Sequence, residues 1–402
     1  MTAAIALPCK SDILIYAELL TNIRHITIKA SLPTPADHTT AAEIIDEGRK
    51  FRINHNGITA EAVLPATAPV KGLLPVSQTG FIDLTWRLPL QPVRAPERQF
   101  LPENQPLPWS ASDIKSGSPV SCRTCSQIFL QNGVINIWKD LPSENWAEMM
   151  EFWHCHKPVE HDQPDEGDLQ HRGYGAASAI TAQPGVGFVD ITSCHFAESD
   201  CRSIKFSSPE SSEKLDSSEN AIKTTNEEKF LNIYCSNCAS DVGTFSILAS
   251  TVALFKWQIA CEVSPVQEGP SSSDCLVATL LSTIARSGSS KSVVMSRNMS
   301  SADESSRHLQ LWVLNNNVIF TSNRINTPTS AVKVLFKEIG EKEALDLVES
   351  LSNDVQDINF PAPAIQVARK TLKSSQDMLP SSERSFQEWQ VGLLERWVPR
   401  RA

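Results

Sequence analysis

The sequence lacks the features of a membrane-spanning or secreted protein. No apolar run in its 402 residues approaches the roughly 18 residues that a membrane helix needs. Its first stretch, MTAAIALPCKSDILIYAELL, has neither the basic start nor the continuous apolar core of a signal peptide. Cysteine is scarce, because ten residues in a chain of 402 are too few for a disulfide scaffold. We therefore expect a soluble protein without a membrane partner, in the reducing compartments of the cytosol and nucleus.

The chain also lacks the positive charge of a general nucleic-acid binder. Only 20% of its residues are charged, and 46 acidic against 36 basic residues give a net charge of −10. Such a balance opposes a broad grip on phosphates, so we expect protein partners and no direct nucleic-acid contact. Hydrophobic residues make up 41% of the chain, enough to bury sizeable cores. The length suits two domains or one large bilobal body.

Several catalytic signatures are missing. The sequence contains no Walker motif, no Gly-x-Gly-x-x-Gly and no Gly-x-Ser-x-Gly, and GYGAAS at 173–178 is too loose to count. These absences give no support to a P-loop nucleotide enzyme, a dinucleotide-dependent enzyme or a serine hydrolase of the α/β type.

Two Cys-x-x-Cys pairs are the most informative feature that is present. Cys122 and Cys125 lie in SCRTC, and Cys235 and Cys238 lie in YCSNC about 110 residues further on. Each spacing lets one tight turn present two thiolates to a metal at about 2.3 Å. The long separation costs about 1.5 kcal/mol of extra loop entropy, against about 10 to 16 kcal/mol for structural zinc binding. We therefore predict one shared four-thiolate zinc site, which is structural because no position remains for water.

The pattern of apolar residues predicts a fold that is α+β and β-rich. In the first 100 residues, a hairpin is predicted around Asn56-Gly57, where residues on both sides alternate between apolar and polar. Further predicted elements are strands at 81–88, 245–259, 308–314, 318–321 and 331–336, a turn at 315–317, and helices at 276–285, around Ala344 to Leu351, and at 382–397. We expect a bilobal protein, in which a mainly β N-terminal half and an α+β C-terminal half are joined by the shared four-cysteine zinc site.

Composition suggests four consecutive regions. They are a β-rich region 1–120, a region 121–197 with the first Cys pair and a Cys/His segment, an insertion 198–229, and an α+β region 230–402 with the second Cys pair. The insertion is rich in Ser, Glu and Lys with almost no large apolar residues, so we expect it to be disordered. Residues 264–274 and 286–306 have a similar composition.

A helix is predicted in LPSENWAEMMEFWHCHKP. Ser143 can cap it, an apolar stripe that includes Trp153 has helical spacing, and Pro158 prevents its continuation. The stripe by itself indicates a core face. Cys155 and His156 follow at the helix end, where they could contact a metal or simply be a packed thiol and a His favoured by the helix dipole.

Thiols are the candidate nucleophiles. If the two pairs hold zinc, the thiols that remain are Cys9, Cys155, Cys194, Cys201, Cys261 and Cys275. A reactive thiol needs a lowered pKa from a nearby His or a helix N-terminus. Cys155 and Cys194 each have a His beside them in sequence, which does not establish proximity in the fold.

The run from SCRTC through LPSENWAEMMEFWHCH, with YCSNCASDVG, FKW, HLQLWVLNN and SFQEWQVGLLERW further along, resembles the ubiquitin-conjugating-enzyme-binding proteins described as HECT-like ubiquitin ligases. The resemblance covers the chain from about Ser121 to Val398. It implies a zinc-bound Cys pair from each half, binding to a ubiquitin-conjugating enzyme, and promotion of ubiquitin transfer to protein substrates.

The resemblance also implies a link to the cleavage and polyadenylation endonuclease of pre-mRNA 3′-end processing. A Cys of the Trp-x-Cys-His segment would enter the active site of this metallo-β-lactamase-type enzyme, which makes Trp153, Cys155 and His156 the predicted partner-binding residues. A true HECT ligase has its thioester Cys near the C-terminus, whereas no Cys follows Cys275 here. The catalytic residue is therefore unassigned. A ligase or ligase-like adaptor is the first hypothesis, and a non-catalytic inhibitor or escort of the endonuclease is the alternative.

Overall fold

The computed structural model describes residues 13–21, 23–76, 79–90, 106–141, 182–207, 230–296, 308–350 and 354–399. Two compact units divide the chain. Unit 1 combines residues 1–106 with residues 276–398, and unit 2 consists mainly of residues 107–275. The chain is β-rich with few helices, as predicted. The four predicted regions are consecutive in the sequence, whereas unit 1 combines one segment from the N-terminal part of the chain with one from the C-terminal part.

Unit 1 contains a nine-stranded sheet with the order β22-β23-β20-β19-β1-β2-β7, in which β18 pairs with both β19 and β21. Its strands are β1 (Leu14–Leu20), β2 (His25–Ser31), β7 (Asp83–Pro89), β18 (Lys291–Met295), β19 (His308–Ser322), β20 (Ile325–Ile339), β21 (Val355–Asn359), β22 (Ser385–Phe386) and β23 (Trp389–Glu395). The pairing of β1 with β19 is antiparallel. The beginning and the end of the chain thus share one sheet.

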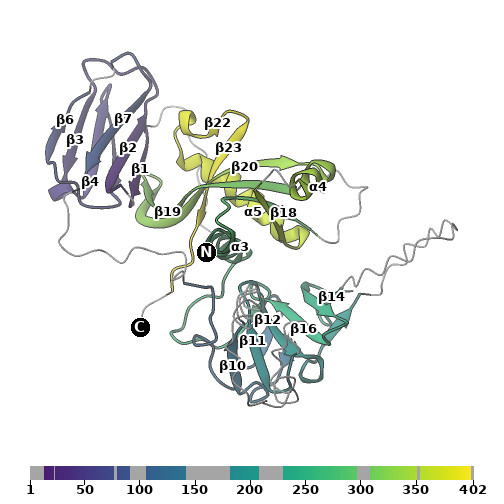
Figure 1. Cartoon of the computed structure of the whole chain (residues 1–402). Coiled ribbons are helices and arrows are strands. Elements are labelled where there is room, and N and C mark those ends of the chain that lie inside the picture. Colours follow the sequence, from purple (N-terminus) through teal and green to yellow (C-terminus); the bar gives the residue numbers. More distant parts are fainter. Residues whose placement is uncertain are drawn as a thin grey trace, which may run out of the picture. The chain divides into compact units, whose positions relative to one another are not determined.

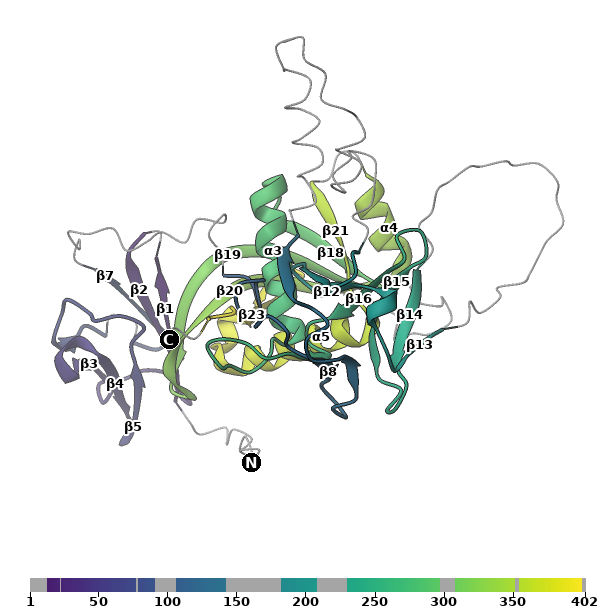
Figure 2. The same cartoon turned by 90° about the horizontal axis from the view of Figure 1, so that it is seen from below.

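A four-stranded sheet of order β5-β4-β3-β6 accompanies β1, β2 and β7. Its strands are β3 (Ala41–Ile45), β4 (Lys50–His55), β5 (Ile58–Val63) and β6 (Gly72–Leu74), and the short 3₁₀ helix η1 (Asp46–Gly48) joins β3 to β4. Figure 2 shows the two layers, and their facing side chains form one core that includes Phe51 and Trp86. The predicted hairpin is confirmed, because Asn56 and Gly57 adopt φ of 51° and 79° between β4 and β5.

Strands β19 and β20 are long, and Figure 1 shows β19 as a curved strand. The predicted turn at 315–317 is wrong, because β19 continues through it. Its register on β20 passes from Asn315 opposite Lys333 to Val318 opposite Ala331, so β19 has one extra residue there. The asparagines form a bulge in which the Asn317 N–H donates to Asn315 Oδ1 at 2.9 Å.

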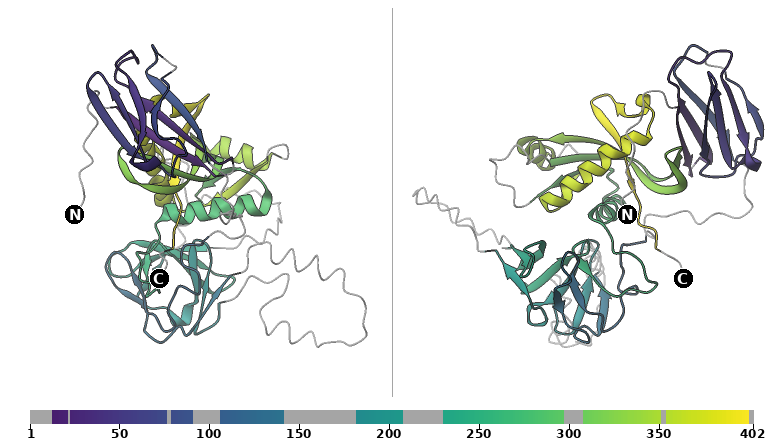
Figure 3. Two further views of the ribbon diagram at one scale, coloured as in Figure 1. Left: turned by 90° about the vertical axis from the view of Figure 1, so that its left-hand side faces the viewer. Right: turned by 180° about the vertical axis from the view of Figure 1, so that it is seen from behind.

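The C-terminal elements are α4 (Glu341–Glu349), α5 (Ala362–Ser375), η4 (Gln376–Met378), η5 (Ser381–Glu383) and the β22–β23 hairpin. Helix α4 was predicted, α5 was missed, and the predicted helix at 382–397 is wrong. In that segment Val391 and Leu393 face one core of the sheet, while Gly392 lies against α5. A Cβ on Gly392 would lie 2.7 Å from Leu372 Cδ2. Figure 3 shows α5 against the sheet.

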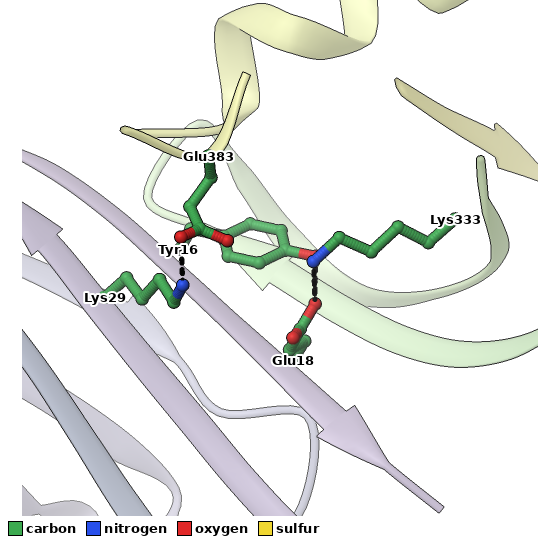
Figure 4. Close-up of polar contacts among 5 residues, drawn as sticks. All are labelled: Tyr16, Glu18, Lys29, Lys333 and Glu383. Atoms are coloured by element: carbon green, nitrogen blue, oxygen red, sulfur yellow. Dashed lines mark hydrogen bonds and ion pairs between the residues drawn. The ribbon is translucent and has the colours of Figure 1, made fainter. Parts of the chain in front are cut away.

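A buried polar cluster lies inside unit 1 between strands from opposite ends of the chain (Figure 4). The hydroxyl of fully buried Tyr16 donates to Glu18 Oε2 at 2.8 Å, and Lys333 Nζ lies 2.9 Å from the same oxygen. Lys29 of β2 forms an ion pair with Glu383 of η5. Burial and then the neighbouring Glu18 carboxylate raise the pKa of Tyr16 well above its ordinary value. Tyr16 is therefore a neutral hydrogen-bond donor to Glu18 within β1, and the ion pair of Glu18 with Lys333 links β1 to β20.

Unit 2 contains a seven-stranded sheet of order β10-β11-β12-β16-β15-β14-β13 and a three-stranded sheet of order β17-β8-β9. The strands are β8 (Val120–Cys122), β9 (Ile128–Leu130), β10 (Ile137–Asp140), β11 (Val186–Val189), β12 (Ser193–Ala197), β13 (Ile204–Phe206), β14 (Phe230–Cys235), β15 (Asp241–Ser246), β16 (Thr251–Phe255) and β17 (Ile259–Ala260). The strand predicted at 245–259 is thus divided by two turns among β15, β16 and β17.

Helix α3 (Ser272–Ser287) contains the predicted helix at 276–285. It starts earlier than predicted because Ser271 Oγ donates to Asp274 Oδ2 at 2.7 Å, while the Asp274 N–H donates back to Ser271 Oγ at 3.1 Å. Residues 264–274, which resemble the insertion in composition, therefore include a helix start. None of the helices in the described ranges is long and apolar enough to span a membrane.

The first ten residues of the predicted insertion are part of the fold. Residues 198–200 form the 3₁₀ helix η3, and β13 pairs with β14 from Ile204 opposite Cys235 to Phe206 opposite Ile233. The expectation of disorder was therefore wrong for 198–207, because strand pairing compensates for the polar composition. The remainder, 208–229, lies outside the described residues.

Candidate metal centre

The four cysteines of the two Cys-x-x-Cys pairs meet in unit 2. Their Sγ atoms all lie within 4.8 Å of one another. Across the pairs, Cys122 Sγ is 3.7 Å from Cys238 Sγ, and Cys125 Sγ is 3.6 Å from Cys235 Sγ. Four thiolates at about 2.3 Å from a tetrahedral ion would lie about 3.8 Å apart. The prediction that two distant segments form one four-sulfur cluster is therefore confirmed.

The first pair occupies a tight turn that follows β8. Cys122 is the last residue of β8, and its N–H donates to the carbonyl oxygen of Gln127 at 2.8 Å. The Ser126 N–H donates to the Cys122 carbonyl oxygen at 2.8 Å, and Ser126 adopts φ of 61°. This backbone path brings Cys125 back toward Cys122, so both sulfurs point to one place.

The second pair repeats the same backbone turn after β14. The Cys235 N–H donates to the Ser240 carbonyl oxygen at 2.9 Å, and the Ala239 N–H donates to the Cys235 carbonyl oxygen at 2.9 Å. Ala239 adopts φ of 58°, like its counterpart in the first turn. The two turns carry the three-stranded and the seven-stranded sheet to a common centre, so the cluster joins two sheets of one unit.

Cys122 and Cys235, the first cysteine of each pair, are buried. Desolvation raises the pKa of Cys122 to about 12 and also raises the pKa of Cys235. In both turns, the backbone N–H groups two and three residues further along donate to the sulfur and oppose this rise. Such donors favour the thiolate, and a bound cation would complete the stabilisation that they begin.

Cys238 has the opposite environment. Its sulfur lies 3.2 Å from Ser240 Oγ, and hydrogen bonds from the Ser240 hydroxyl and N–H lower the pKa of Cys238 to about 6. Cys238 therefore ionises more readily than Cys122 and Cys235, whose pKa values are raised. Sequence reasoning missed Ser240, although a hydroxyl residue two positions after the second Cys of a pair is a visible signal.

Arg123, between the two cysteines of the first turn, fixes that turn to the surrounding loops. Its guanidinium donates to the carbonyl oxygens of Lys256 at 2.9 Å, Ile259 at 3.1 Å and Pro270 at 2.7 Å. The Cβ of any other residue at Gly269 would overlap the guanidinium. The ligand turn is therefore held by a side chain that does not point at the metal position.

The donor set fits a metal with a preference for sulfur. Four thiolates in a tetrahedral arrangement are typical of zinc or of iron in sulfur coordination. The sulfurs fill all four positions, which leaves no place for substrate or activated water. A metal bound there would stabilise the fold and would not take part in catalysis.

The other predicted residues are not brought to this centre. Cys194 and His195 are neighbours on β12, so their side chains point to opposite faces of the sheet, and this His is not placed to activate this Cys. Burial raises the pKa of Cys194 to about 11. Trp153, Cys155 and His156 lie outside the described residues, so their partner contacts stay a prediction.

Comparisons with known proteins agree with the sequence pattern. The chain is 21% identical over 289 residues to the uncharacterized protein YJR141W of Saccharomyces cerevisiae, covering 70% of this chain and 71% of that protein. It is 44% identical over 54 residues to the uncharacterized protein C1734.10c of Schizosaccharomyces pombe, covering 12% of this chain and 15% of that protein. No solved structure matches it significantly. A family model described as HECT-like ubiquitin-conjugating enzyme (E2)-binding matches residues 18–391, and the chain therefore belongs to this family.

Proposed function

We propose that this protein is a zinc-stabilised adaptor that binds a ubiquitin-conjugating enzyme and promotes transfer of ubiquitin from that enzyme to a protein substrate. Membership of the E2-binding family supports the first part of the proposal. The four-cysteine centre supports a stabilising role for the metal, because the two ligand turns bring two sheets of unit 2 together without leaving a coordination position for catalysis.

Outside the four-cysteine centre, the thiols in the described part of the chain favour an adaptor over a thioester-forming ligase. Thioester formation needs a thiolate nucleophile, and burial raises the pKa of a thiol and keeps it protonated. The pKa is raised to about 11 at Cys194 and to about 12 at Cys201 and Cys275, and that of Cys261 is also raised. In each of the four, desolvation is the largest cause. This shared property is the observation that carries the choice of an adaptor.

A single-turnover discharge assay tests the proposal. A conjugating enzyme charged with ubiquitin is mixed with the full chain, and the products are separated with and without reductant. We expect faster discharge of the conjugating enzyme and no reductant-sensitive ubiquitin adduct on this chain. Variants Cys194→Ala and Cys275→Ala should discharge the enzyme at the same rate.

Two results would contradict the adaptor. A reductant-sensitive adduct would identify the chain as a thioester enzyme, and the same assay on Cys155→Ala would then show whether Cys155 is the nucleophile. Unchanged discharge together with no binding of the conjugating enzyme would remove the ubiquitin function altogether.

A further inference from the structure

Ser240 lies where the two ligand turns meet. Its Oγ is 3.2 Å from Cys238 Sγ and 3.4 Å from Thr124 Oγ1 of the first turn. Ser240 and Thr124 are 116 residues apart in the chain. One small side chain therefore contacts a ligand of the second turn and a hydroxyl of the first.

The first turn has no equivalent of this side chain. Gln127 occupies the corresponding position, since its carbonyl oxygen accepts from the N–H of Cys122 as that of Ser240 accepts from Cys235. The side-chain amide of Gln127 donates instead to Ser203 Oγ at 2.9 Å. The two turns thus have the same backbone hydrogen-bond pattern. They differ in the side chain at this position, which contacts a cysteine sulfur in the second turn and Ser203 in the first.

Cys238 is one of the two ligands that lie at an exposed corner of the centre. Cys122 and Cys235 are only 1% exposed, whereas Cys125 and Cys238 are half-buried. Water and chelators reach a ligand at an exposed corner first, so metal loss begins there when that sulfur swings away. A polar contact on the sulfur fixes the direction of the ligand, as outer partners of metal ligands do.

We propose that Ser240 is a positioning residue of the four-cysteine centre, which holds the Cys238 sulfur toward the metal and ties the second turn to the first through Thr124. The proposal rests on the zinc centre of the proposed function. Its consequence is that the hydroxyl of Ser240 controls how readily the metal leaves, although it is not itself a ligand. Outer partners of metal ligands change metal affinity by about 10- to 100-fold when they are removed.

Zinc transfer from the full-length protein to a chromophoric chelator tests this role. Ser240→Ala should lose zinc about 10-fold faster than the parent chain. Ser240→Thr keeps the hydroxyl and should restore the slow rate. Ser236→Ala is the matched control, because Ser236 lies in the same turn and its side chain makes no hydrogen bond to a cysteine sulfur in the described part of the chain.

A second readout reports the geometry directly. With Co²⁺ in place of zinc, the absorption bands of a tetrahedral four-thiolate centre should shift or weaken in Ser240→Ala and be unchanged in Ser236→Ala and Ser240→Thr. Equal zinc loss from the parent chain and Ser240→Ala, or an equal effect of Ser236→Ala, would overturn the positioning role alone. A parent chain that contains no zinc and takes up no Co²⁺ would overturn the metal centre and this role with it.

Discussion

Lys256 is a fully buried cation in unit 2 that holds a loop in place. Its Nζ donates to the carbonyl oxygens of Pro108 at 2.6 Å and Trp109 at 2.9 Å. Removing the ammonium group leaves both buried acceptors unpaired, at a cost of about 1 to 3 kcal/mol each. We predict that Lys256→Met, which keeps most of the volume, lowers the melting temperature of unit 2 by about 5 to 10 °C.

The matched control for this prediction is Lys205→Met on β13, because Lys205 is exposed. Thermal unfolding of both variants, followed by hydrogen exchange in β8 and β16, measures the effect. An equally small loss of stability in both variants would show that the buried ammonium is not needed.

His195 should make the stability of unit 2 depend on pH. Burial lowers the pKa of His195 from its ordinary value of 6.5, while Asp190 opposes the shift. The unfolded chain therefore binds more protons below about pH 6.5. The stability that neutral His195 provides is complete above that pH and is lost as the pH falls through the lowered pKa. We expect His195→Gln to weaken the loss of stability between pH 7 and pH 5.

Urea unfolding over this range checks the prediction by the difference between variants, because His308 of unit 1 also has a lowered pKa. His38→Gln, at an exposed position, is the control. If the pH dependence of His195→Gln matches that of the parent chain, the role of His195 is excluded.

For single residues, the sequence predicts a role where that role depends on neighbours in the sequence. The clustering of Cys122, Cys125, Cys235 and Cys238 could be predicted because each pair needs only one turn to present two sulfurs. The role of Lys256 and the contact of Ser240 with Thr124 could not, because both depend on segments far away in the chain.

Among the elements, the errors have one physical origin. Residues 382–397 have apolar side chains that a helix could also place on one face, but the edge of β20 offers a ladder of hydrogen bonds, and β23 pairs with it from Leu394 opposite Val332 to Gln390 opposite Phe336. Strand pairing outweighed local preference there and also at β13, whose polar composition suggested disorder. Hairpins such as β4–β5 were predictable because the Asn-Gly turn is local.

The β13–β14 pairing gives the insertion a sharp boundary. The Ser207 N–H donates to the Asn232 carbonyl oxygen at 2.9 Å, so residue 207 is still part of the ladder. We predict that replacing residues 208–229 with about five Gly/Ser residues leaves the melting temperature and metal content nearly unchanged, since a hairpin loop of that length closes readily. Deleting from 198 instead should reduce both, because β13 is lost beside Cys235.

Melting curves and metal analysis of the two deletion variants compare these outcomes. Equal losses in both variants would mean that residues 208–229 also stabilise the fold. No loss in either variant would mean that β13 is dispensable.

For the whole molecule, the chain order places unit 2 between the two segments of unit 1. Unit 1 has its own hydrophobic cores. One lies between the four-stranded sheet and strands β1, β2 and β7, and another lies on the sheet in which β1 pairs with β19. All four cysteines belong to unit 2. Metal binding should therefore be coupled to the folding of unit 2 and should leave the pairing of β1 with β19 intact.

Replacement of one ligand tests this coupling. Structural zinc binding supplies about 10 to 16 kcal/mol, which is comparable to the whole unfolding free energy of a typical domain, roughly 5 to 15 kcal/mol. Cys235→Ser should therefore lose zinc and unfold unit 2, which hydrogen exchange would detect as lost protection in β8, β14 and β15 with protection kept in β1 and β19. Cys201→Ser, outside the centre, should keep both zinc and protection. Protection lost equally in both units, or a parent chain purified without zinc, would contradict a centre that stabilises unit 2 alone.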